Sequence, residues 1–122
     1  MKLIDKDLMS MQEVRELVES AKEAQRELAR MDQAQVDRIV KSIADAGVRN
    51  AKRLAQMAQE DTGFGVVSDK VVKNVFASRG VYEHIKGMKT IGEIERDDAK
   101  GLRKIAVPVG VIAGLIPSTN PT

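Results

Sequence analysis

The sequence contains no cysteine, no tryptophan and a single histidine. Without Cys the chain has no disulfide, no thiolate nucleophile and none of the ligands that most structural zinc sites require. His84 has no Ser, Cys or acidic partner at a convincing spacing, which favours a surface or structural role. The neighbouring Asp97 and Asp98 favour a solvated turn. We therefore expect no metal site.

Aromatic residues make up 2% of the chain, and Phe64, Phe76 and Tyr82 are far apart in sequence. Proteins that bind single-stranded nucleic acid need aromatic faces on which bases stack. The 20 Lys and Arg residues are nearly balanced by 18 Asp and Glu residues, and the net charge is +2. Because no concentrated basic field is present to contact phosphates, we expect no nucleic-acid partner.

Long hydrophobic runs are also missing. The apolar segment 105–117 is shorter than the roughly 20 residues that a helix needs to cross a bilayer. Residues 1–7 carry charges where a signal peptide would have its apolar stretch. These features predict a cytoplasmic protein with no membrane partner. The length of 122 residues and the 43% share of hydrophobic residues predict about one folded domain.

The first part of the chain has helical periodicity. Ser10 with Glu13, and Asp32 with Gln35, have the spacing of a capping box and predict two helix starts. We expect Gly47 to stop or bend the second helix, and a third helix to end in the glycine-containing segment 61–65. Ser68 is the expected cap of a fourth helix.

The second part is β-prone and is punctuated by Gly and Pro. Segments 90–95 and 102–107 flank a polar stretch and predict a β-hairpin. Residues 109–116 are apolar on both faces, as in a parallel strand that helices cover on each side. Such a strand needs neighbouring strands that this sequence does not supply. We therefore expect the chain to be the front of a longer protein.

A short polar loop, residues 117–122, follows the predicted strand, where open α/β sheets bind their ligands. Pro117 and Pro121 restrict the backbone, so the loop could present the Asn120 amide at a fixed angle. An amide held in this way can donate to an oxygen that gains negative charge. The alternative is a polar turn that binds no ligand.

Residues 107–122 resemble the strand and loop of the aldehyde dehydrogenase superfamily, specifically its CoA-acylating branch. Thr119 stands where hydrolytic members usually carry Trp, and Pro121 directly follows Asn120. Residues 60–70, with the sequence EDTGFGVVSDK, resemble a helix-end signature of the same branch. The resemblance extends from about Ser10 to Thr122, and so covers nearly the whole chain.

The resemblance implies an α/β fold of the aldehyde dehydrogenase type: N-terminal helices, a β-hairpin and the first strand of an incomplete Rossmann-type cofactor domain. It divides the chain into a helical segment 1–89, a hairpin 90–108, and residues 109–122 as the first strand and Asn loop of a truncated NAD-binding domain. In this family a Cys thiolate adds to an aldehyde, a hydride passes to NAD, and the acyl group is transferred to coenzyme A.

The resemblance also assigns roles to residues of the loop. Asn120 would hold the tetrahedral oxyanion, and four preceding residues would lie along the nicotinamide ribose: Ile116, Pro117, Ser118 and Thr119. The catalytic Cys lies beyond this sequence, so we expect the 122-residue chain alone to be inactive, and the intact enzyme to be a homo-oligomer acting on a small aldehyde. Two alternatives stay open, a noncatalytic helical interaction module and a hydrolytic aldehyde dehydrogenase.

Overall fold

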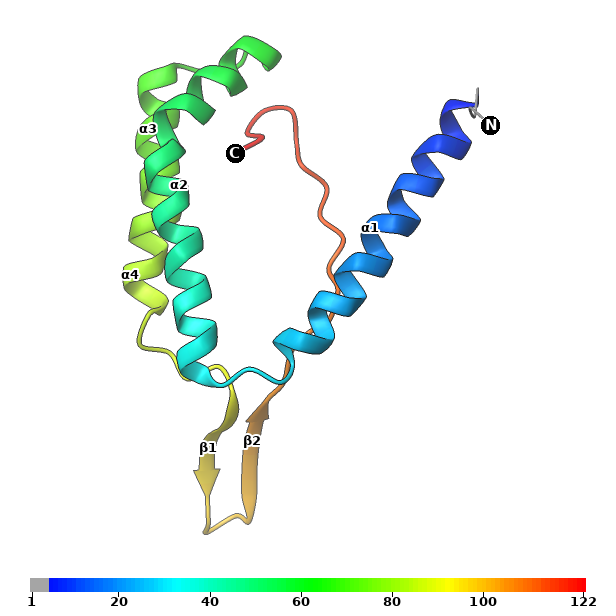
Figure 1. Ribbon diagram of the computed structural model, residues 1–122. Coiled ribbons are helices and arrows are strands. Elements are labelled where there is room, and N and C mark those ends of the chain that lie inside the picture. Colours follow the sequence, from blue (N-terminus) through cyan, green and yellow to red (C-terminus); the bar gives the residue numbers. More distant parts are fainter. Residues whose placement is uncertain (1–4) are drawn as a thin grey trace. The chain divides into compact units, whose positions relative to one another are not determined.

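A computed structural model describes residues 5–122, and residues 1–4, the start of the charged N-terminal stretch, lie outside it. Figure 1 shows its elements along the chain: α1 (Lys6–Leu28), α2 (Gln33–Thr62), α3 (Val67–Val75), the π-helical segment η1 (Phe76–Gly80), α4 (Val81–Ile85), β1 (Gly92–Asp97) and β2 (Leu102–Ala106). They form two compact units, each made of two segments. The first unit comprises Met1–Met31 and Ile91–Ala113, and the second comprises Asp32–Thr90 and Gly114–Thr122.

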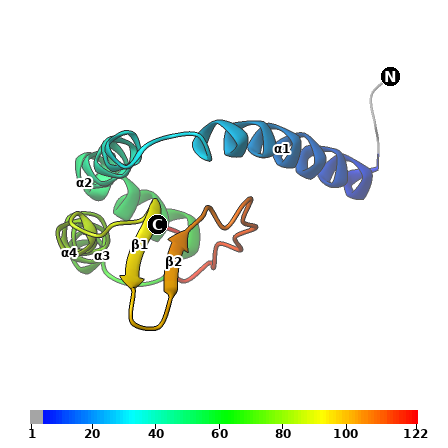
Figure 2. The same ribbon diagram turned by 90° about the horizontal axis from the view of Figure 1, so that it is seen from below.

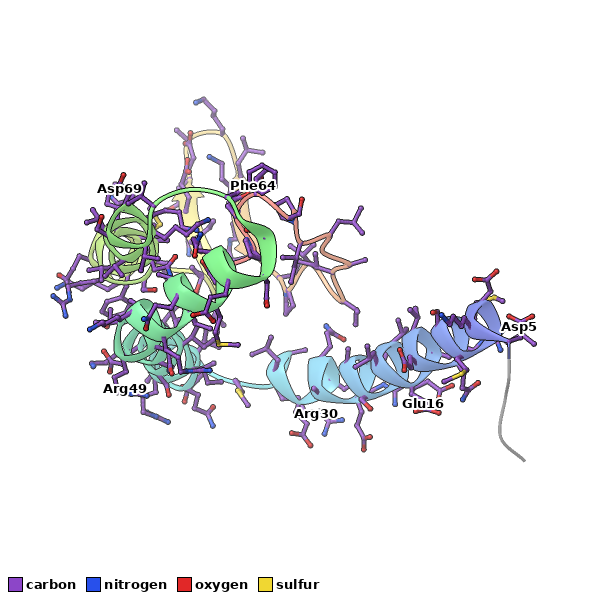
Figure 3. All side chains as sticks on the ribbon, turned by 90° about the horizontal axis from the view of Figure 1, so that it is seen from above. Asp5, Glu16, Arg30, Arg49, Phe64 and Asp69 are labelled. Carbon is purple, nitrogen blue, oxygen red and sulfur yellow. The ribbon has the colours of Figure 1, made fainter. Side chains whose placement is uncertain are left out.

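Helix α1 of the first unit begins before the predicted position. The Asp5 carboxylate caps it by accepting hydrogen bonds from the backbone nitrogens of Asp7 (2.9 Å) and Leu8 (3.2 Å). The predicted start at Ser10 is therefore wrong, because an equally strong capping residue lies earlier in the chain. No residue of α1 is buried. Figure 3 shows its side chains extending outward, among them the labelled Glu16.

The hairpin of the first unit confirms the predicted β-hairpin. Strands β1 and β2 pair antiparallel, from Gly92 opposite Ala106 to Asp97 opposite Leu102. The register shifts between Glu93 and Glu95, which marks a β-bulge. Cross-strand ion pairs support the pairing: Lys104 Nζ lies 2.5 Å from Glu95 Oε2, and Arg103 Nη1 lies 3.5 Å from Glu93 Oε2.

In the second unit, α2 lies alongside α3, η1 and α4, as Figures 1 and 2 both show. The buried apolar side chains of α2 are all small: Ala44, Ala51, Ala55 and Ala58. The predicted capping box is confirmed, since Asp32 Oδ1 accepts from the Gln35 nitrogen (2.8 Å) and Gln35 Oε1 accepts from the Asp32 nitrogen (2.9 Å). The predicted helix end is also confirmed, with Gly63 in the left-handed region at φ 71°.

Two predicted helix boundaries in the second unit are wrong. Gly47 was expected to stop or bend the second helix, and the stop does not occur: α2 continues through Gly47, so the predicted second and third helices are one helix of 30 residues. A glycine inside a helix costs about 1 kcal/mol, and the packing of α2 against α3 and η1 offsets it. Ser68 does not cap α3, because the N-cap position is Val66 and no side chain caps it.

The predicted strand at 109–116 is not formed. These residues have no regular secondary structure, and Val109 and Ile116 are 91% and 76% exposed. The physical reason is that a strand needs hydrogen-bonded neighbours, and within residues 5–122 β1 and β2 pair with each other alone. None of the helices described is both long and apolar enough to cross a membrane.

Candidate functional site

The predicted site residues lie together at the C-terminal turn of the second unit. Ser118 and Thr119 form the turn, Ile116 precedes it, and Asn120 follows it with an exposed side chain. Figure 1 shows this end of the chain bending back toward α2 and α3. The proximity follows from sequence adjacency, whereas the roles assigned to these residues stay predictions.

The side chain of Asn120 is oriented by its neighbour. The Thr119 hydroxyl donates to Asn120 Oδ1 at 3.1 Å, which occupies the amide oxygen. Among residues 5–122, no group accepts a hydrogen bond from the Asn120 Nδ2 atom. The Asn120 amide nitrogen is therefore a donor with no acceptor among residues 5–122.

A lysine of α3 holds the backbone of the turn. Lys70 Nζ donates to the carbonyl oxygen of Thr119 at 3.2 Å, across 49 positions of sequence. The Lys70 side chain is 7% exposed. Burying an ammonium group is costly unless hydrogen bonds replace its water, so this contact constrains the turn more than a surface lysine would.

A second buried polar residue of α3 reaches the end of the same loop. Asn74 Oδ1 accepts from the Thr122 hydroxyl at 2.9 Å, and Asn74 Nδ2 donates to the carbonyl oxygen of Ala51 in α2 at 3.1 Å. Lys73 adds exposed hydrogen bonds from its Nζ atom to Thr122 O and Oγ1, at 2.9 and 3.2 Å. The loop is thus bound to α3 on both sides of Asn120.

The sequence analysis missed this polar face of α3. The sequence patterns assign no role to Lys70, Lys73 or Asn74. A signal was present, because residues at i, i+3 and i+4 share one face of a helix and polar residues recur there between valines. That pattern alone also fits an ordinary solvated face, so it could not have indicated burial.

The arrangement can present a hydrogen-bond donor, and its other chemical capacities are limited. A donor of this kind stabilises an oxyanion that a nucleophile creates, and the sequence holds no Cys to act as one. Residues 5–122 contain no group of three or more His, Cys, Asp and Glu side chains placed to hold a metal ion. His84 is exposed on α4, while Asp97 and Asp98 pair with Lys100 and Arg96 in the hairpin.

Comparison with known proteins supports one family. The model of the aldehyde dehydrogenase family matches residues 3–122. Over 110 residues the chain is 46% identical to the bifunctional aldehyde-alcohol dehydrogenase of Escherichia coli K12, covering 90% of this chain and 12% of that protein. It is 46% identical over 107 residues to an acylating sulfoacetaldehyde dehydrogenase of Cupriavidus necator, covering 86% of this chain and 22% of that one.

A solved structure gives the same result. An acetylating aldehyde dehydrogenase from Geobacillus thermoglucosidasius superposes with a TM-score of 0.94 at 54% identity, over 98% of this chain and 26% of that chain. The chain therefore spans roughly a quarter or less of the relatives named here. The expected aldehyde dehydrogenase-like fold is confirmed, with helices and a two-stranded antiparallel sheet. Because the family model covers nearly all of its residues, the chain belongs to the aldehyde dehydrogenase family.

Proposed function

We propose that the chain is part of a NAD-dependent, CoA-acylating aldehyde dehydrogenase that oxidises a short aldehyde to an acyl-CoA through a Cys thioester. The observation that carries this proposal is the similarity to acylating and acetylating enzymes over nearly the whole chain. The Asn120 turn, with its free amide donor, lies within the matched residues. The Cys belongs to sequence outside these 122 residues.

In this proposal Asn120 acts on the first intermediate. When a thiolate adds to the aldehyde carbon, the C=O π electrons move to oxygen, and Asn120 Nδ2 donates to the resulting oxyanion. NAD, when bound, would accept the hydride that leaves the aldehyde carbon as the oxyanion re-forms its C=O bond, which leaves a thioester. The thiolate of coenzyme A would then attack the thioester carbon, which forms the acyl-CoA and regenerates the Cys thiolate as the leaving group.

The backbone before Asn120 is proposed to line the cofactor site. The four residues concerned are exposed or form the turn that Lys70 holds, so their backbone groups are accessible to a ligand: Ile116, Pro117, Ser118 and Thr119. They would lie along the nicotinamide ribose.

The test is an assay of the protein expressed from the complete reading frame that encodes this chain. Acetaldehyde and propionaldehyde are supplied with NAD, with and without coenzyme A, while NADH and acyl-CoA are measured. We expect NADH formation that depends on coenzyme A, with one acyl-CoA formed per NADH. Release of free acid without coenzyme A would instead identify a hydrolytic enzyme.

A noncatalytic interaction module is the competing function from another class. The exposed apolar residues of α1 favour it, and they include Leu8, Met11, Val14 and Leu17. It predicts no NADH formation with any aldehyde and a reading frame without a downstream Cys. We further propose that the enzyme is a cytoplasmic homo-oligomer, which light scattering of the purified protein and fractionation of cells would test.

A further inference from the structure

The glycine-containing segment before α3 makes room for the buried lysine. Gly65 has φ +75°, and a Cβ added to it would lie 3.1 Å from Lys70 Cε and 3.5 Å from Lys70 Nζ. Glycine adopts this backbone conformation without strain. Because Gly65 has no side chain, the end of the Lys70 side chain can lie next to it. Gly65, in the segment between α2 and α3, therefore helps to position the Lys70 ammonium group.

The two buried polar residues of α3 lie on one face, four positions apart, and each contacts a different side of Asn120. Lys70 contacts residue 119 through the carbonyl oxygen, and Asn74 contacts residue 122 through the hydroxyl. Asn74 is 6% exposed and is itself held by the Ala51 carbonyl of α2. The loop thus takes its position from two helices of the same unit.

We propose that Lys70 and Asn74 are positioning residues, which fix the loop so that the Asn120 amide meets the oxyanion of the acylating reaction. This inference rests on the proposed function, since it assigns the two residues to the same site. Neither residue touches substrate in the proposal. Each acts through the backbone that carries Asn120, and Pro121 limits the conformations of the residues between the two contacts.

The main experiment compares Lys70→Met with Lys52→Met in the protein from the complete reading frame. Met has similar length but no donor, and Lys52 is an exposed lysine of α2. We expect Lys70→Met to lower kcat by about tenfold to a hundredfold, since small displacements of a reacting group have effects of this size. The KM for NAD should change much less, and Lys52→Met should leave both unchanged.

A double-mutant cycle with Asn120→Ala separates positioning from general loss of structure. If Lys70 acts through Asn120, Lys70→Met should lower kcat only slightly once Asn120 is already replaced. An equal fold-change in both backgrounds, or an unchanged kcat in the single variant, would overturn the proposal. Thr122→Val provides a second route if Lys70→Met fails to fold, because at an exposed position it removes the hydroxyl's contacts to Asn74 and Lys73, which also hold the loop against α3. It should also lower kcat.

Hydrogen–deuterium exchange distinguishes failure of this inference from failure of the proposed function. In Lys70→Met, backbone amides of the peptide covering 116–122 should exchange faster than in Lys52→Met, whether or not the protein turns over an aldehyde. Faster exchange with an inactive wild-type protein would reject the proposed function and retain Lys70 as the residue that holds the loop. Equal exchange in the two variants would reject the role of Lys70 itself.

Discussion

A Cβ atom placed on Gly47 in α2 would lie 2.2 Å from the Oγ atom and 3.0 Å from the Cβ atom of Ser78 in η1. The absence of a side chain at Gly47 therefore lets the backbone of α2 approach η1 closely. A residue that was expected to stop or bend the helix is thus a packing position within a continuous helix.

The first prediction concerns this contact. Gly47→Ala should lower the free energy of unfolding by about 1–3 kcal/mol, the usual cost of forcing extra atoms into a packed contact. In a Ser78→Gly background, where both clashing atoms are gone, the same substitution should become stabilising by up to about 1 kcal/mol, because Ala is the better helix former. Urea denaturation of the four proteins measures both values. If Gly47→Ala raised the free energy of unfolding in both backgrounds, the close approach of Gly47 to Ser78 would be contradicted.

The second prediction concerns the buried amide of Asn74. Asn74→Ala should lower the free energy of unfolding by about 1–3 kcal/mol, because it removes the donor to the Ala51 carbonyl and the acceptor for the Thr122 hydroxyl. Asn50→Ala is the matched control. Asn50 also donates to a carbonyl oxygen, that of Ala46, but within its own helix and with partial exposure. Its replacement should change the free energy by no more than about 0.5 kcal/mol.

The third prediction concerns the pH dependence of an exposed ion pair. The hydrogen bond between Lys41 Nζ and Asp45 Oδ2, 2.6 Å long, lowers the pKa of the Asp45 carboxyl and raises the pKa of the Lys41 ammonium. The ion pair therefore stabilises the fold at pH values where Asp45 is ionised and Lys41 is protonated, between the pKa of Asp45 and the pKa of Lys41. Its contribution is lost as the pH falls through the folded-state pKa of Asp45, or rises through that of Lys41.

NMR titration of the Asp45 side-chain carbon measures this effect. Lys41→Met should return the pKa of Asp45 toward its ordinary value, and high salt should act in the same direction because both groups are exposed. The effect on stability should be small for the same reason. An Asp45 titration that is identical with and without Lys41 would show that the ion pair does not form in solution.

The fourth prediction concerns Asn120 in the protein from the complete reading frame. Asn120→Ala should lower kcat by about a hundredfold to a thousandfold, since it removes one donor to an oxyanion. Binding of NAD, followed by protein fluorescence or calorimetry, should persist because the proposed ribose contacts come from the preceding backbone. If turnover is unchanged, Asn120 has no part in the mechanism.

Local chemistry made several elements predictable. The Asp32–Gln35 capping box, the left-handed Gly63 and the hairpin around residues 98–101 each depend on residues close together in sequence. The family was also predictable, because the loop around Asn120 and the segment 60–70 carry specific residue patterns. These features need no knowledge of distant contacts.

The remaining features depend on tertiary contacts that a local pattern does not contain. The helix continues through Gly47 because η1 lies against it, and sequence spacing cannot report that neighbour. The strand at 109–116 was predicted from its apolar residues, but no partner for it lies within residues 5–122. Lys70 and Asn74 likewise bond to residues of the loop 117–122, which is 48 or 49 positions away in sequence, and a local pattern does not contain that contact.

The alanine core of α2 has a consequence for how the loop is placed. Alanine has no side-chain rotamers to lose on folding, so these residues are buried without side-chain entropy cost. Helix α2, which carries these residues, packs against α3. Asn74 of α3 donates to the Ala51 carbonyl of α2 and accepts from the Thr122 hydroxyl, so the contact between the two helices also bears on where Thr122 is held. The packing of these two helices is thus a geometric determinant of the loop that carries Asn120.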